Sequence, residues 1–266
     1  MPRVRRSEHE QSIVDQHGPD FLESLARGLK VLRVFGDEQR RMTLSDVARL
    51  ADLPRATVRR ALYTLEKLGY AESDGKLFAL TPQVLELASS YLSSNNLSII
   101  LQPAMDRVAS AAQEVCSVAI LDRHDAVFVA RASPARVFLN GLEIGYRLPA
   151  ASASVGRAML GRMDDEELET WLAHAPLPKL TAQTVVDRRK LKCLIIRDRE
   201  QGYSLVDQEA EPGFRSISVP IRRYDGGIVA AMNIGAHVDR VPIERMEAEF
   251  LPLLRKTAAE VKPLLF

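Results

Sequence analysis

One segment of the sequence carries arginine and threonine side chains at helical spacing. Between Arg40 and Lys67, seven side chains are basic and three are acidic. Arginine and hydroxyl groups are the types that contact the phosphate oxygens and base edges of DNA. The candidate DNA-binding residues are therefore Thr43, Ser45, Arg55, Ala56, Thr57, Arg59, Arg60 and Thr64. The alternative is an ordinary pair of helices whose charged face is solvated.

A second set of residues is small and polar, and its chemistry suits a small ligand. Ser216 and Ser218 alternate with apolar residues, and Ala231, Asn233 and Gly235 do so in the next apolar run. Two neighbouring strands with matching faces of this kind would leave room for a ligand and offer it hydrogen bonds. The alternative is the solvated face of an antiparallel sheet.

Small residues also precede a helix that we predict from Val155. The run from Pro149 to Ser154 leaves the backbone N–H groups unobstructed, and a helix start carries unpaired donors that suit a carboxylate. Arg131 and Arg147 are further candidates for a counter-charge, although such arginines are more often surface residues. The predicted effector-binding residues are Ser152, Ser154, Val155, Val206, Ser216, Ser218, Ala231 and Asn233.

Neither catalytic nor metal-binding spacing is found in the sequence. The segment from Ser152 to Gly156 is similar to a nucleophile elbow but lacks its first glycine, and the five histidines are scattered. Cys116 and Cys193 have no Cys-x-x-Cys spacing, so we predict two buried, inert thiols. We therefore predict no enzyme, no metal and no cofactor. An enzyme with an appended DNA-binding domain is the alternative.

Local signals around the first set predict a winged helix-turn-helix. Thr43 and Asp46 form a T-x-x-D cap for a helix that ends near Ala51, and Pro54 suits the first position of a second helix, which Gly69 ends. Asp74-Gly75 between short apolar runs predicts a hairpin, which would be the wing.

These signals divide the chain into four parts. We predict a flexible arm at residues 1–20, a winged helix-turn-helix domain at 21–80, a linker helix at 81–96 and an effector-binding domain at 97–266. In the second part, the apolar positions from about Pro19 to Phe35 fit a helical period and predict a scaffold helix against which the other two pack; these positions are Leu22, Leu25, Leu29, Leu32 and Val34/Phe35. The linker helix has two apolar sides, which favours a connector or a dimer contact.

The last part alternates helical and strand-like runs. Helices predicted at both ends enclose antiparallel strands, which indicates an α+β domain of GAF-like type. There is no apolar run of 18 residues and no signal-peptide core, so we expect a cytoplasmic protein without a membrane partner.

Several motifs resemble those of the IclR family of bacterial transcriptional regulators. The amino-terminal ones are Ser24-Leu25-x-Arg27-Gly28-Leu29, the segment from Leu53 to Leu62, and Leu65-x-x-Leu68-Gly69-Tyr70. The carboxy-terminal ones lie at 145–150, 154–160 and 207–221, and are closest to the branch that senses protocatechuate and 4-hydroxybenzoate. Ala151 departs from the family pattern, which more often has a larger residue there.

The resemblance implies a transcriptional regulator that binds double-stranded operator DNA as a homodimer or a dimer of dimers. It further implies control by a small aromatic carboxylate from a catabolic pathway, with an aliphatic organic acid as the alternative. A ligand-free architectural DNA binder or protein-interaction module is a second alternative.

Overall fold

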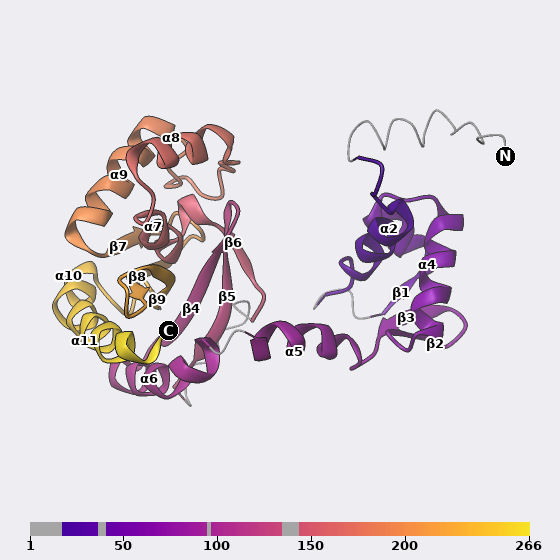
Figure 1. The fold of residues 1–266 in the computed structure, drawn as a ribbon, viewed down its shortest axis with the longest axis horizontal. Helices are drawn as coiled ribbons and strands as arrows, with labels where there is room; N and C mark the ends of the chain where they lie inside the picture. Colours follow the sequence, from indigo (N-terminus) through magenta and orange to yellow (C-terminus); the bar gives the residue numbers. More distant parts are fainter. Residues whose placement is uncertain (1–17, 37–40, 95–96, 135–143) are drawn as a thin grey trace. The chain divides into compact units, whose positions relative to one another are not determined.

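The computed structural model describes residues 18–36, 41–94, 97–134 and 144–266 (Figure 1). The chain divides into two compact units, Met1–Ser93 and Ser94–Phe266. Most of the arm predicted at residues 1–20 lies outside the described residues. The four domain limits given above stay predictions.

In the described residues of the first unit, three helices pack together ahead of the wing. They are α2 (Glu23–Leu32), α3 (Leu44–Ala51) and α4 (Arg55–Lys67). Thr43 caps α3 through the predicted reciprocal bonds with Asp46, and Pro54 is the residue immediately before α4 instead of its first residue. Val47, Val58 and Leu62 are fully buried between the helices. The predicted helix-turn-helix is confirmed.

A small sheet completes this unit. Strands β2 (Ala71–Ser73) and β3 (Leu77–Leu80) form the predicted hairpin, and the short β1 (Met42–Thr43) adds a third strand in the order β1-β3-β2. Asp74 accepts hydrogen bonds from the backbone N–H groups of Lys76 and Leu77, which tightens the turn at Gly75. The wing is therefore held by its own local bonds.

The packing predicted for α2 is confirmed only in part. The helix packs on α3 and α4, and Leu32, Val34 and Phe35 contact the core around the fully buried Val31. Leu22, Leu25 and Leu29, which belong to the same predicted stripe, are instead 66%, 59% and 49% exposed. After the wing, α5 (Val84–Ser94) forms the predicted linker helix, with Leu85 and Leu87 exposed.

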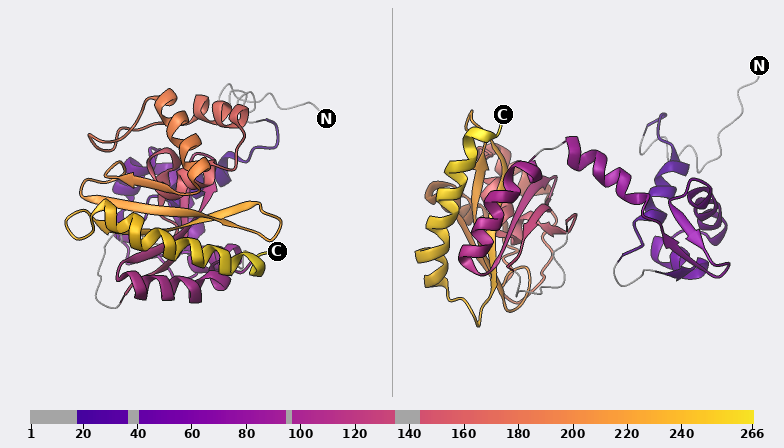
Figure 2. Two further views of the ribbon diagram at one scale, coloured as in Figure 1. Left: turned by 90° about the vertical axis from the view of Figure 1, so that its left-hand side faces the viewer. Right: turned by 90° about the horizontal axis from the view of Figure 1, so that it is seen from below.

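The second unit is built on a six-stranded antiparallel sheet, seen edge-on in Figure 2. Its order is β6-β5-β4-β9-β8-β7, so the hairpin of β4 and β5 joins the carboxy-terminal strands through the β4–β9 pair. The strands are β4 (Val115–Asp122), β5 (Asp125–Ala132), β6 (Arg147–Pro149), β7 (Ser204–Asp207), β8 (Phe214–Arg222) and β9 (Ile228–His237).

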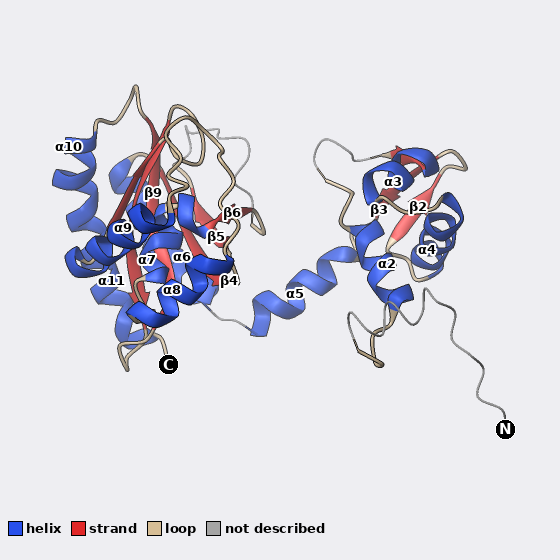
Figure 3. Ribbon diagram, turned by 90° about the horizontal axis from the view of Figure 1, so that it is seen from above, coloured by secondary structure: helices blue, strands red, loops and turns tan. Residues whose placement is uncertain are grey.

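Helices cover both faces of this sheet (Figure 3). On one face, α6 (Leu97–Ala112) and α11 (Leu251–Val261) enclose the main core with Ile217, Met232 and Ile234. A short helix, α10 (Ile243–Arg245), and a π-helical turn, Met246–Phe250, lead into α11. The other face carries a 3₁₀ turn, Ala150–Ser152, and the helices α7 (Ser154–Leu160), α8 (Asp165–His174) and α9 (Arg188–Gln201). The predicted α+β class is confirmed.

One prediction about the cysteines is wrong. Cys116 lies in the core, where burial raises the pKa of its thiol, but Cys193 is exposed on α9. The segment from Ser133 to Gly145, for which the sequence predicts loop and strand, falls mostly outside the described residues. None of the helices in the described ranges is long and apolar enough to cross a membrane.

Candidate DNA-binding and effector-binding sites

The exposed side of α4 carries the candidate DNA-contacting groups. Arg55, Ala56 and Arg59 are exposed, opposite the buried Val58, Leu62 and Leu65. In the described part of the chain, the side chains of Arg55, Arg59 and Arg60 form no ion pair. Three guanidinium groups are thus available to phosphate oxygens or base edges.

A groove borders the same helix on the side of α2. It is about 520 Å³ in volume, and its walls include Leu25, Leu29 and Leu68 together with Thr57, Arg60 and Thr64. The candidate DNA-contacting residues of α4 therefore lie in two places. Arg55, Ala56 and Arg59 are outside this groove, whereas Thr57, Arg60 and Thr64 line it.

The two candidates on α3 differ in their bonding. The Thr43 hydroxyl donates to the Asp46 carboxylate at 2.7 Å and accepts from the Asp46 backbone N–H at 3.2 Å. These bonds hold the pKa of Asp46 below its ordinary value. Thr43 is therefore occupied in capping the helix, whereas Ser45 is exposed.

A small cavity lies between α7 and the sheet, at the place predicted for the effector. Six of the eight predicted residues line it: Ser152, Ser154, Val155, Val206, Ser216 and Asn233. The other two predicted residues, Ser218 and Ala231, do not line the cavity. Ser218 is fully buried, and Ala231 packs in a cluster with Ala119 and Phe128. Sequence reasoning missed five lining residues, which are Phe128, Leu148, Ala153, Ala210 and Phe214.

Polar groups inside this region are only partly paired. The hydroxyls of Ser154 and Ser216 are 2.8 Å apart, and both residues are buried. Asn233 is 5% exposed, and its Oδ1 atom has no hydrogen-bond partner among the described residues; the same holds for the hydroxyl of its cross-strand neighbour Ser218. A buried acceptor without a partner is costly, so Asn233 favours a molecule that donates a hydrogen bond to it.

The cavity is closed tightly by an aromatic side chain. Its volume is about 30 Å³. The Phe214 ring lies against Gly235, where a Cβ atom would approach the ring carbon Cζ to 2.4 Å. An engineered cavity that binds benzene has a volume of about 150 Å³. An aromatic ligand would therefore have to displace some of the walls.

The start of α7 is held close to the preceding turn by a glycine. A Cβ atom at Gly156 would lie 2.1 Å from the carbonyl oxygen of Ala150, so a larger residue would push the helix away. All seven residues of α7 are buried. This segment is consequently a fixed wall of the cavity.

One buried cation lies beside the cavity, and sequence reasoning did not single it out. Arg157 on α7 is 1% exposed and forms an ion pair of 2.7 Å with Glu209, which is 8% exposed. Arg147, considered above as a counter-charge, instead forms exposed ion pairs with Asp122 and Asp125. Hydrogen bonding to Asp122 is the main reason that the pKa of Arg147 is raised.

A winged helix-turn-helix together with an α+β domain that encloses a small cavity is the arrangement of two-domain DNA-binding transcriptional regulators. Residues 24–75 match the IclR helix-turn-helix domain, and residues 89–262 match the carboxy-terminal domain of the bacterial transcriptional regulator IclR. The chain belongs to the IclR family of bacterial transcriptional regulators. The family resemblance of the motifs is confirmed.

Individual proteins are similar to this chain over most of its length. The Pca regulon regulatory protein of Pseudomonas putida is 42% identical over 249 residues, covering 93% of this chain and 86% of the relative. A transcriptional regulator from Rhodococcus sp. RHA1 has 43% identity and a TM-score of 0.80, covering 91% of this chain and 97% of that one. An IclR homologue from Microbacterium hydrocarbonoxydans, complexed with 4-hydroxybenzoate, has 27% identity and a TM-score of 0.76, covering 90% and 98%.

The described residues contain no group of three or more His, Cys, Asp or Glu side chains placed to hold a metal ion. The relatives compared above are regulators, and the family membership rests on both domains.

Proposed function

We propose that this protein is a cytoplasmic regulator of aromatic-acid catabolism whose operator binding or activity is controlled by a small aromatic carboxylate. The observation that carries the proposal is the buried cavity with the unpartnered Asn233 Oδ1 and the serine hydroxyls. The 4-hydroxybenzoate bound by the Microbacterium homologue supports a ligand with a carboxylate at one end and a hydroxyl at the other.

The polarity of the walls suggests how such a ligand lies. Among the described residues that line the cavity, none carries a charge. A carboxylate would be held by hydroxyl and backbone N–H donors at the start of α7, and a phenolic hydroxyl would donate to Asn233. This arrangement uses hydrogen bonds to an anion, which are stronger than neutral ones.

The DNA half of the proposal rests on α4. Arg55, Ala56 and Arg59, with Ser45 from α3, would enter the major groove, while Thr57, Arg60 and Thr64 would act from the border of the α2 groove. The exposed leucines of α2 and α5 support a homodimer or a dimer of dimers, because large apolar side chains that are exposed together often mark an interaction surface. A dimer requires a palindromic operator.

A thermal-shift screen and calorimetry test the effector. We expect 4-hydroxybenzoate to raise the melting temperature in a concentration-dependent way, since a ligand that binds only the folded state stabilises it. Methyl 4-hydroxybenzoate keeps the ring and the hydroxyl but removes the charge, so it should bind much more weakly. An ester that bound as tightly as the acid would overturn the carboxylate assignment. An aliphatic acid that bound while every aromatic acid failed would favour the alternative ligand class.

A further inference from the structure

The connection between β7 and β8 forms one wall of the cavity. This strap, residues Gln208–Gly213, contains the lining residue Ala210 and leads directly into Phe214. Gln208 and Gly213 adopt the left-handed conformation, with φ of 58° and 78°. The strap belongs to no helix or strand. Backbone bonds hold its two ends, from the Gln208 N–H to the Phe214 carbonyl oxygen at 2.9 Å and from the Val238 N–H to the Gly213 carbonyl oxygen at 2.8 Å, and side-chain contacts hold Glu209 between them.

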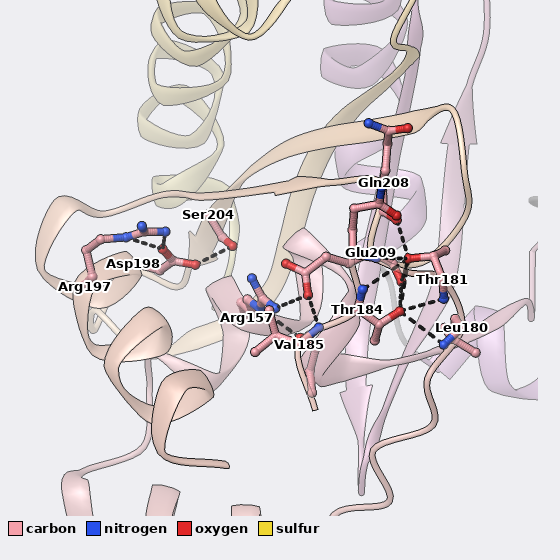
Figure 4. A network of polar contacts seen from close by, with 12 residues as sticks. Arg157, Leu180, Thr181, Thr184, Val185, Arg197, Asp198, Ser204, Gln208 and Glu209 are labelled. Carbon is pink, nitrogen blue, oxygen red and sulfur yellow. Dashed lines mark hydrogen bonds and ion pairs between the residues drawn. The ribbon is translucent and has the colours of Figure 1, made fainter. Parts of the chain in front are cut away.

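The Arg157–Glu209 ion pair supplies the main contact. Arg157 Nη2 donates to Glu209 Oε2 at 2.7 Å, and Arg157 Nε donates to the carbonyl oxygen of Ala151 at 2.8 Å. One buried guanidinium thus joins three walls: the strap, helix α7 and the 3₁₀ turn that carries Ser152. Figure 4 shows the two side chains pointing toward one another.

A second group of bonds holds the strap from the loop before α9. Glu209 Oε2 also accepts from the Val185 backbone N–H at 3.1 Å, and the Glu209 carbonyl oxygen accepts from the Thr184 hydroxyl at 2.7 Å. The Thr181 hydroxyl donates to the carbonyl oxygen of Gln208 at 2.7 Å (Figure 4). Both the side chain and the backbone of Glu209 are therefore fixed.

We propose that Arg157 and Glu209 are positioning residues that hold the strap as the size-limiting wall of the cavity, and so determine which aromatic acids the protein accepts. This inference rests on the proposed function of the cavity. The two charges neutralise each other, so the pair acts through the strap and not by attracting the ligand. Because α7 and the sheet are packed on all sides, the strap is the wall that a larger ring would have to displace.

The test compares two acids of different size on the full-length protein. The probes are 4-hydroxybenzoate and 6-hydroxy-2-naphthoate, with affinities measured by calorimetry. The parent should prefer the smaller acid by roughly 10-fold to 200-fold, the range of size discrimination in apolar pockets. Glu209→Gln should reduce this preference to less than about threefold by loosening the strap. A change in the electrostatic potential affects both acids alike, so the ratio of affinities reports the wall and not the charge.

Glu114→Gln is the matched control. Glu114 is 5% exposed and pairs with Arg240 at 2.9 Å, but neither residue lines the cavity. This variant removes a similarly buried carboxylate and should keep the parental ratio of affinities, although both variants lose stability. Equal loss of discrimination in the two variants would mean that general destabilisation causes it, and would overturn the inference.

The remaining outcomes separate this inference from the proposed function. A parent that bound neither acid nor any other organic acid would refute the effector cavity itself, and the inference with it. A parent that bound both acids equally well, or a folded Glu209→Gln protein with the parental ratio, would overturn only the role of the strap. If Glu209→Gln does not fold, Thr184→Val removes the hydroxyl bonded to the Glu209 carbonyl oxygen, and a parental ratio in that variant contradicts the inference.

Discussion

The polar groups of α4 and those of the effector cavity lie in opposite surroundings. Arg55 and Arg59 extend from the helix into solvent, whereas Ser154, Ser216 and Asn233 are buried and Arg157 pairs with a residue far along the chain. Substitution of an exposed residue of α4 should therefore leave the fold intact. Near the cavity, the same groups that define the site also hold the domain together, so site and stability cannot be varied independently.

The largest effect should come from removing the buried cation. Arg157→Met leaves Glu209 buried and unpaired, and we expect the free energy of unfolding to fall by about 3–5 kcal/mol. Urea denaturation of the whole chain measures this change. The same substitution on the exposed helix, Arg59→Met, should change it by less than about 0.5 kcal/mol. Equal losses of unfolding free energy in the two variants would contradict the difference inferred between the two regions.

The next effect concerns the cavity wall. Ser154→Leu places a branched side chain in a space of about 30 Å³, so the variant should lose its response to 4-hydroxybenzoate while keeping operator binding. Overpacking should also cost about 1–3 kcal/mol of stability. Operator binding with and without the acid measures the response, and Ser110→Leu, at an exposed position of α6, is the control. If operator binding by the Ser154→Leu protein still responded to the acid, the ligand would have to bind at another place in the protein.

On α4, Arg59→Ala and Arg60→Ala should both weaken operator binding. A lost base contact would cost about 1–3 kcal/mol and relax specificity, whereas a lost phosphate contact would weaken all sequences alike and flatten the salt dependence. Binding at several salt concentrations distinguishes the two, with Arg107→Ala in the other unit as the control. Arg60 lines the groove beside α2, whereas Arg59 does not. Unequal losses of operator affinity in the two variants would therefore show that the two positions of this helix contribute differently to binding. Parental binding by both variants would refute the assignment of α4.

The smallest effect is local to the start of α3. Removing the hydroxyl in Thr43→Ala should raise the pKa of Asp46 toward its ordinary value, because that hydroxyl is the main group that lowers it. A lowered pKa contributes stability above the unfolded value of about 3.9, and this contribution is lost as the pH falls through the folded pKa. NMR titration checks the shift. The control is Thr64→Ala, which removes a hydroxyl that donates to the Arg60 carbonyl oxygen. The pKa of Asp46 should not change in this variant.

The sequence predicted the local structure of the DNA-binding unit better than the surroundings of the cavity. The helix-turn-helix and the wing depend on local signals such as the Thr43 cap and the Asp74-Gly75 turn, and these are readable within a few residues. Alternation along β8 and β9 also gave Ser216 and Asn233. Which part of the apolar stripe of α2 is buried was not readable, because leucines at helical spacing show that a face is apolar but not what covers it.

The complete set of residues around the cavity could be identified only from the folded structure. Phe128 and Phe214 carry no polar signal in the sequence, and the antiparallel register of the sheet brings them to one space with α7. Arg157 was not singled out, because charged side chains are rarely buried unless paired, and its partner Glu209 is 52 residues away. Long-range pairing of this kind leaves no local pattern.

The central strand pair has a consequence for how the chain is made. Val115 in β4 pairs with Gly235 in β9, so the middle of the sheet cannot form until nearly the whole chain has been synthesised. Contacts between distant residues slow folding, and during translation the amino-terminal domain generally folds first. A nascent chain would therefore carry a folded DNA-binding unit before its sensor exists, and the folding rate of the sheet would set how long that unregulated state lasts.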